Sequence, residues 1–273
     1  MEIEEFLTRM NIKGADNTFY KREEKDVKII NNGEESIEKR LGINVYTRFN
    51  DGSAAVVGFI TYDKTFPDDI FSMNPGVLAK ILSESDSIYI DGTFLVGTSK
   101  YGDIKEDIEP ATWKTIKAKY ENPPIVIKSE YINKLLKRSE IIDPNRITLK
   151  SDGKELIITL YSKIGSSISQ VKIPCNFIIE AEPWTNPFLE VLDRVKDYDI
   201  NLYVDAMNPQ DRKKSPIKIE ISDKTAVISY YITETHIISN KEEKPKNKKE
   251  KKEEKEVEEE DIDDDELQTK LDL

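Results

Sequence analysis

The chain has 273 residues and a formal net charge of −12, with 34 % charged and 37 % hydrophobic residues. The acidic excess argues against indiscriminate nucleic-acid binding over the whole surface, although it allows a local basic face. The single cysteine, Cys175, rules out a disulfide within the chain and fits a reducing compartment. We find no signal-peptide pattern and no apolar run of membrane-spanning length, so we expect a soluble cytoplasmic protein, at a nucleoid or viral replication site, without a membrane partner.

The segment before Phe71 predicts a helix followed by strands. Four apolar residues at helical spacing predict the opening helix: Ile3, Phe6, Leu7 and Met10. The runs NTFYK, DVKII, INVYTRF and AAVVGFITY predict strands, with a hairpin turn at Asp51-Gly52 and a polar insertion over residues 31–40 that interrupts the pattern.

A first regular unit begins at Phe71. A short strand precedes Asn74 and Pro75, which predict a helix cap and a first-turn proline. A brief helix follows, then a hairpin across Asp91-Gly92 and a weaker strand near residues 102–108.

Two further units follow the same order of elements. From Pro124, PPIVIK predicts a strand, Ser129 caps a helix that ends before Pro144, and three strands follow, the first two joined across Ser151-Asp152-Gly153. From Cys175, a strand leads to a helix capped by Thr185 or Asn186, and three more strands follow.

Four copies of this βαβββ unit, with the segment before Phe71 as a degenerate copy, predict an α+β fold of two similar domains. The expected domains are residues 1–108 and 123–238, with residues 109–122 as the connector. Residues 239–273 form a low-complexity charged tail that we expect to be disordered.

The duplicated βαβββ order resembles the DNA sliding clamps, namely proliferating cell nuclear antigen and the T4-type phage clamp. The resemblance covers most of residues 1–237 and is strongest over 123–233. It implies a clamp fold with helices on one face and antiparallel sheets on the other, closed as a homotrimeric ring around duplex DNA. It also implies a processivity factor that binds double-stranded DNA without sequence preference and has a DNA polymerase and a clamp loader as partners.

The resemblance implies that the helices present basic residues to DNA phosphates. The expected DNA-facing residues are Arg9, Lys13, Lys80, Lys134, Lys137, Arg138, Arg194 and Lys196. An ordinary solvated helix face is the alternative interpretation, and the acidic residues Glu190, Asp193 and Asp197 dilute the positive charge of the last helix.

A partner-docking surface is implied beside the connector and the last strand, where Trp113, Tyr120 and Ile237 are the candidates. Either aromatic side chain could instead pin the connector onto its own domain. Leu271 and Leu273 lie in a terminal sequence, QTKLDL, that resembles the short peptides by which other proteins bind clamps. The alternative is a solubilising terminus.

The sequence lacks the residue patterns of an enzyme. With His236 as the only histidine, no histidine pair can form, and there is no Gly-rich phosphate-binding loop. We therefore expect no catalytic residue, no metal and no cofactor. The alternative function is a non-encircling, clamp-like or viral β-rich scaffold that binds proteins rather than DNA.

Overall fold

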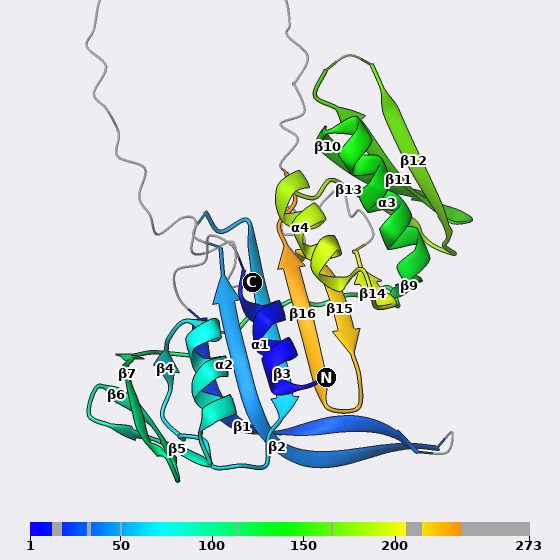
Figure 1. The fold of residues 1–273 in the computed structure, drawn as a ribbon. Helices are drawn as coiled ribbons and strands as arrows, with labels where there is room; N and C mark the ends of the chain where they lie inside the picture. The colour runs from blue at the N-terminus through cyan, green and yellow to red at the C-terminus, as the bar shows by residue number, and fades with distance from the viewer. Residues whose placement is uncertain are drawn as a thin grey trace, which may run out of the picture.

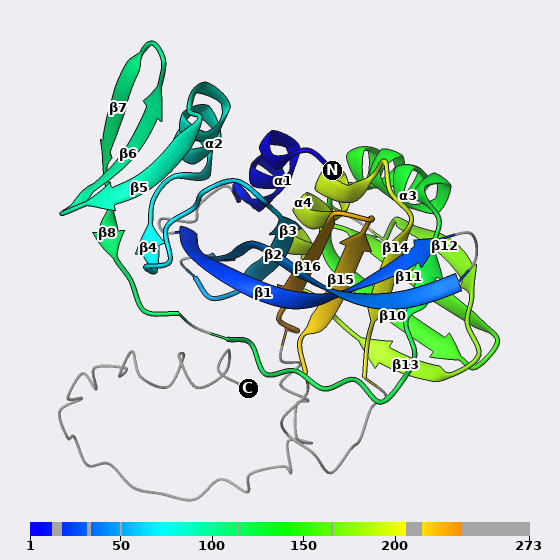
Figure 2. The same ribbon diagram turned by 90° about the horizontal axis from the view of Figure 1, so that it is seen from below.

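The computed structural model describes residues 1–12, 18–31, 34–49, 51–113, 115–164, 166–205 and 215–235. In these residues four helices lie on one side of the sheets (Figures 1 and 2). The helices are α1 (Ile3–Met10), α2 (Pro75–Glu84), α3 (Ser129–Ile142) and α4 (Thr185–Val195). None of them combines the length and the apolar composition that a membrane span requires.

The strands form three antiparallel sheets. Those of the N-terminal half are β1 (Thr18–Asn31), β2 (Glu34–Arg48), β3 (Ala54–Thr61), β4 (Phe71–Ser72), β5 (Ser87–Asp91), β6 (Phe94–Ser99), β7 (Gly102–Asp107) and β8 (Glu109–Pro110). Those of the C-terminal half are β9 (Ile125–Ile127), β10 (Pro144–Asp152), β11 (Glu155–Ser162), β12 (Ile168–Pro174), β13 (Ile178–Ala181), β14 (Ile200–Tyr203), β15 (Ile217–Ser222) and β16 (Ala226–Ile232).

The predicted repeat is confirmed, and neighbouring copies exchange their leading strands. β13, which leads into α4, pairs with β10, and β9, which leads into α3, pairs with β14. In the N-terminal half, β4 leads into α2 and pairs with β1. The first copy has no strand ahead of α1 in the described residues, so the sheet β5–β6–β7 has three strands.

A single nine-stranded sheet runs through both halves of the chain, in the order β8-β4-β1-β2-β3-β16-β15-β14-β9. Its middle is the antiparallel pairing of β3 with β16, which sets Gly58 opposite Ile228 and which we call the internal seam. The two predicted domains thus share one hydrogen-bonded sheet.

The long β1–β2 hairpin corrects one prediction. Residues 31–40 are not an insertion that interrupts the strands, because all of them except 32 and 33, which lie outside the described residues, belong to the paired strands β1 and β2. The pairing from Thr18↔Thr47 to Asn31↔Glu34 is continuous, and the hairpin extends beyond the sheet (Figure 1).

The helix caps agree with the sequence in one case only. The side chain of Asn74 accepts hydrogen bonds from the amides of Gly76 and Val77, as predicted. Ser129 is the first helical residue of α3 rather than its cap, and its amide donates to Asp199 Oδ1 at 3.0 Å. The predicted cap of α4 at Thr185 or Asn186 is also wrong, because Trp184 is the cap residue and makes no side-chain cap bond.

The helices bury their apolar faces against the sheets. Phe6, Leu7 and Met10 of α1 are fully buried, and Ile132 and Leu135 of α3 are 1 % and 2 % exposed. Burial of side chains of this size contributes roughly 1.5–3 kcal/mol each, which holds the helix layer in place. The polar faces of all four helices therefore point away from the sheets.

Candidate nucleic-acid and partner interfaces

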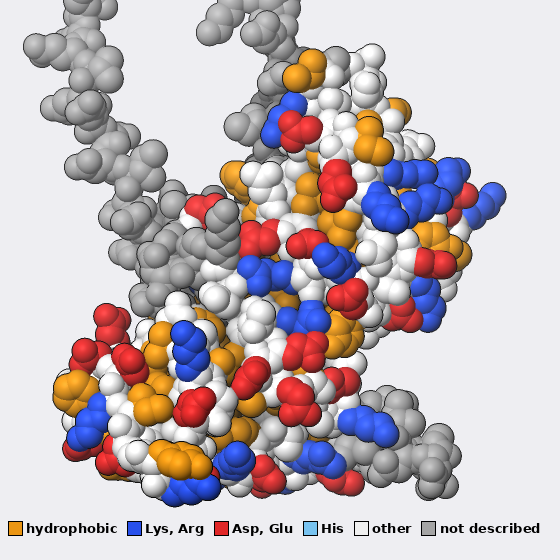
Figure 3. Space-filling model, viewed as in Figure 1, with side chains coloured by type: hydrophobic (Ala, Val, Ile, Leu, Met, Phe, Trp, Pro, Cys, Tyr) orange, Lys and Arg blue, Asp and Glu red, His pale blue; other side chains and the backbone are white. Residues whose placement is uncertain are grey.

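The basic face of α3 is the strongest positive feature of the helix layer. Lys134 and Lys137 are exposed and have no ion pair among the described residues. Arg138 lies beside them and donates to the carbonyl of Gln170 on β12. Figure 3 shows Lys and Arg side chains gathered over α3. Such a group can contact phosphates without reading a base sequence.

Arg9 and Arg194 connect α1 with α4. Arg9 Nη2 lies 2.9 Å from Glu5 Oε1, and another amino group of Arg9 donates to the carbonyl of Arg194. Arg194 in turn donates to the carbonyl of Thr8 at 3.3 Å. The two side chains are only 14 % and 21 % exposed, so little of either guanidinium is left for an external ligand.

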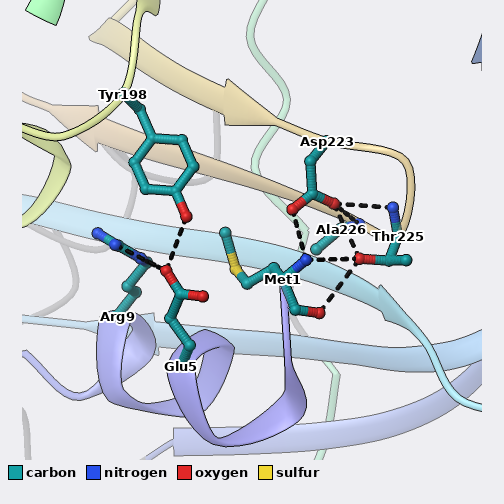
Figure 4. A network of polar contacts seen from close by, with 7 residues as sticks. All are labelled: Met1, Glu5, Arg9, Tyr198, Asp223, Thr225 and Ala226. Carbon is teal, nitrogen blue, oxygen red and sulfur yellow. Dashed lines mark hydrogen bonds and ion pairs between the residues drawn. The ribbon is translucent and has the colours of Figure 1, made fainter.

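A polar network extends this contact across the two halves of the chain (Figure 4). The Tyr198 hydroxyl donates to Glu5 at 2.7 Å, and this bond, with that from Arg9, lowers the pKa of Glu5. The amino group of Met1 lies 2.7 Å from Asp223 Oδ2, in the turn between β15 and β16. α1 is thereby fixed to strands that lie more than 200 residues further along the chain.

The remaining predicted DNA-facing residues differ in their surroundings. Lys80 is exposed on α2, and Lys196, just after α4, pairs with Asp193 at 3.0 Å. Lys13 lies outside the described residues. The structure thus brings together Lys134, Lys137 and Arg138, whereas Arg9, Lys80 and Arg194 lie on other helices. Lys196 lies next to α3, because its carbonyl accepts a hydrogen bond from the Asn133 side chain at 2.9 Å.

The charge balance of the helices is uneven. α3 carries three basic and two acidic residues, whereas α1 and α4 each carry two acidic residues and one basic residue. α2 has Lys80 and Glu84. Any phosphate contact made through the helix layer would therefore be strongest at α3.

Aromatic contacts hold the connector on the sheet face opposite the helices. The ring of Trp113 meets Tyr46 of β2 edge-on, with centroids 6.3 Å apart. Tyr120 lies 5.5 Å from the ring of Tyr203, and its hydroxyl donates to the carbonyl of Pro216 at 2.5 Å. Both aromatic residues thus contact their own chain, and the pinning interpretation describes these contacts.

The cluster beneath Tyr120 contains one cation. Lys218 Nζ lies 3.7 Å from the centre of the Tyr203 ring and 3.0 Å from Glu220 Oε2. Burial is the main cause that raises the pKa of Tyr203 to about 12, with Glu220 adding to it. This cluster contributes a cation and aromatic rings to the surface beside the connector. The other partner-binding candidates, Ile237, Leu271 and Leu273, lie outside the described residues.

The strand edges that lack a strand partner in the described residues include those of β7 and β12. β7 ends the sheet β5–β6–β7, and β12 ends the sheet β12–β11–β10–β13. All six residues of β7 are exposed, and three of them are acidic. Sequence patterns predicted both strands but not that each is an edge, because pairing between distant strands leaves no local signal.

Comparison with known proteins identifies the fold. No family model matches the sequence, and no curated protein sequence matches it either. Among solved structures, proliferating cellular nuclear antigen from Entamoeba histolytica matches at a TM-score of 0.57 and 13 % identity, over 85 % of this chain and 94 % of that chain. PCNA from Thermococcus kodakaraensis matches at 0.57 and 10 %, over 85 % and 95 % of the two chains.

A third structure, the C-terminal region of FEN-1 bound to A. fulgidus PCNA, matches at a TM-score of 0.56 and 13 % identity, over 86 % of this chain and 95 % of that chain. These similarities extend over most of both chains in each case. The predicted α+β clamp fold is therefore confirmed.

Proposed function

We propose that this chain, which has the fold of the DNA sliding clamps, forms a homotrimeric ring that encircles duplex DNA and tethers a DNA polymerase. The observation that carries the proposal is the internal seam, because β7 and β12 are the repeat counterparts of the two strands that form it. β16 and β7 are each the last strand of the second copy in their half, and β3 and β12 are each the last strand of the first copy. A second such seam between chains would use the edges of β7 and β12, which have no strand partner in the described residues.

The internal seam also supplies a register for this contact on the β7 side. The turns of the β6–β7 and β15–β16 hairpins are followed by Gly102 and Ala226, the first residues of β7 and β16. Ile104 therefore corresponds to Ile228, which lies opposite Gly58 in the internal seam.

A row of cross-strand neighbours fixes the β12 side. In each half the row begins four residues before a helix, at Phe71 ahead of α2 and at Ala181 ahead of α4. The two rows are Phe71, Tyr20, Val45, Gly58 and Ala181, Leu149, Ile158, Val171. Val171 therefore corresponds to Gly58, so the seam between chains would place Ile104 opposite Val171.

The charges at this register are complementary. One residue further along, Asp103 comes to lie opposite Lys172, whose amino group already pairs with Glu155 at 2.7 Å. Opposite charges that face each other across two strands favour pairing by roughly 0.2–1 kcal/mol. An apolar pair next to an ion pair supports head-to-tail assembly of identical chains.

The helix layer would line the hole of such a ring, since all four helices lie on one side of the sheets (Figure 2). Lys134 and Lys137 then supply mobile, sequence-independent phosphate contacts from each chain. The surface beside the connector, with Trp113 and Tyr120, is the proposed docking surface for the polymerase and the clamp loader.

A second function, a clamp-like scaffold that binds proteins without encircling DNA, is favoured by one observation. α1 and α4 carry more acidic than basic residues, and Arg9 and Arg194 are bound within the chain. A ring with this lining would attract DNA only at α3.

The proposal is tested by retention on DNA and by mass. A topological ring stays on closed circular DNA and leaves the linearised form, and light scattering should give a mass near three times 31.4 kDa. Asp103→Lys and Lys172→Asp should each reduce the mass toward that of one chain, and the double variant should restore it. Equal retention on both DNA forms, or a single-chain mass at micromolar concentration, contradicts the ring.

A further inference from the structure

Strand β5 has a vacant neighbour position. The other groups of three successive strands that follow a helix each gain a fourth strand from the partner copy, namely β4, β9 or β13. The group β5–β6–β7 gains none, and β6 is the only strand that pairs with β5 in the described residues. The unpaired edge of β5 lies on the opposite side of the sheet from β7, so it would stay accessible in the proposed ring.

The corresponding position in the C-terminal half shows what a fourth strand would cover. Leu202 of β14 lies opposite Ile125 of β9 and is 0 % exposed. The correspondence of Ile104 with Ile228 extends through the strand pairings β7–β6–β5 and β16–β15–β14, and it makes Ile90 of β5 the counterpart of Leu202. Ile90 packs against the core yet is only partly buried. Its neighbour Tyr89, on the other face of the strand, is 46 % exposed. Apolar surface that a strand covers at β14 is thus uncovered at β5.

A carboxylate just before β5 also lacks the kind of cationic partner that the segment after β9 brings to the start of β14. β9 is followed by Lys128, whose amino group lies 2.7 Å from Asp199, the residue directly before β14. By the same correspondence Ser87 is the counterpart of Asp199. Asp86 lies one residue before Ser87, is exposed, and its carboxylate has no hydrogen bond or ion pair among the described residues. Glu84 is exposed close by.

We propose that the outer edge of β5 binds an extended segment of another protein by strand addition. The segment would lie antiparallel to β5, as β4, β9 and β13 lie antiparallel to their neighbours. It carries two apolar residues at alternate positions, which lie opposite Ile90 and the buried Ile88, followed by a Lys or Arg. This basic residue lies opposite Ser87, and its long side chain pairs with Asp86, one residue further along. The proposal does not depend on ring formation or on DNA.

The charge of the edge favours a separate protein over the chain's own tail. Glu84, Asp86 and Asp91 flank the edge, and residues 256–266 of the tail contain nine Asp or Glu. Repulsion between these groups disfavours the tail as the bound segment, whereas a basic partner is attracted.

The probe is a fluorescent peptide with the sequence of residues 121–130, ENPPIVIKSE, which contains β9 and Lys128. Fluorescence anisotropy at low salt should show saturable binding of this peptide to the full chain. Asp86→Asn should weaken the affinity roughly two- to fivefold, the effect of losing one exposed ion pair. Ile90→Asp should weaken it about tenfold or more, since one tenfold step corresponds to 1.4 kcal/mol.

Matched controls use equivalent changes elsewhere on the surface. Asp68→Asn and Ile141→Asp alter side chains that are 89 % and 82 % exposed and should leave the affinity unchanged. A peptide with Ile125→Asp and Ile127→Asp should not bind.

Three results overturn the proposal. The first is no binding of the peptide at millimolar concentration, and the second is equal affinity of the peptide for the wild type and both β5 variants. The third is binding that appears only after residues 264–273 are deleted, because that result would make the chain's own tail the bound segment. Asp86→Asn changes an exposed side chain and keeps the test decisive if Ile90→Asp does not fold. Peptide binding is measured without DNA, so its outcome is separate from that of the ring test.

Discussion

Gly58 allows α1 to pack directly on the internal seam, and its replacement by alanine should displace that helix. A Cβ atom at this position would lie 2.7 Å from Met10 Sδ and 2.8 Å from Phe6 Cζ. Both are side chains of α1, so the helix or its side chains must move. Overpacking of this kind costs about 1–3 kcal/mol, and we expect the lower half of that range because a methionine side chain adapts easily.

A double-mutant cycle with Met10→Ala measures this contact. Met10 is 0 % exposed, so Met10→Ala alone should lower the free energy of unfolding by about 2–5 kcal/mol. In Gly58→Ala/Met10→Ala the new methyl group occupies space that the sulfur has left. The double variant should therefore be more stable than the sum of the single changes predicts, by about 1 kcal/mol.

Urea unfolding with a common m-value gives the free energies. Gly42→Ala is the comparison, because its Cβ would lie 2.2 Å from the backbone carbonyl of Ile60, which cannot rotate away. Gly42→Ala should cost more than Gly58→Ala. Additivity of the cycle to within roughly 0.5 kcal/mol would refute the proposed packing of α1 on Gly58.

Two further predictions concern charge. Burial works to raise the pKa of Asp223, but hydrogen bonds from the Met1 amine, Thr225 and Ala226 hold this pKa below its ordinary value of 3.8. Thermal unfolding should therefore show the wild type to be more stable than Asp223→Asn at neutral pH, and this difference should decline as the pH falls below about 4. A constant difference down to pH 2 would contradict this. Lys134→Gln/Lys137→Gln should weaken duplex binding and reduce the slope of log binding constant against log salt concentration by about 0.9 for each phosphate that the variant no longer neutralises. Lys196→Gln changes a lysine that is paired with Asp193, so it should change this slope less. Equal effects of the two variants would argue against α3 as the main DNA-binding element.

Local patterns predicted most of the fold. The apolar spacing of α3, the proline at 144 and the Asp-Gly turns identified elements that the structure contains. The cap of α3 was missed because Asp199 reaches it from 70 residues away. The second and third strand runs were separated at a polar stretch, residues 31–40, that belongs to the paired strands β1 and β2 wherever the structure describes it. A two-stranded hairpin can extend into solvent with polar residues, so polarity alone did not mark the end of a strand.

The candidate sites were less accessible to sequence reasoning. Arg9 and Arg194 have the spacing of solvent-facing helix residues, yet they contact each other's helices across 185 residues of sequence. The group on α3 was identified because its basic residues lie three and four positions apart on one helix. The strand edges were not, because an edge is defined by which strand is absent beside it.

The internal seam has a mechanical consequence for any ring built from this chain. Within one chain, the seam is reinforced by the covalent connector, by the contact of Met1 with Asp223, and by the bonds that join Glu5 to Tyr198. A β7–β12 seam between chains would have no covalent link. Under strain, each chain should therefore move as one stiff two-domain arc, and the ring should break between chains, which would give a loading machine a defined point at which to pass DNA through.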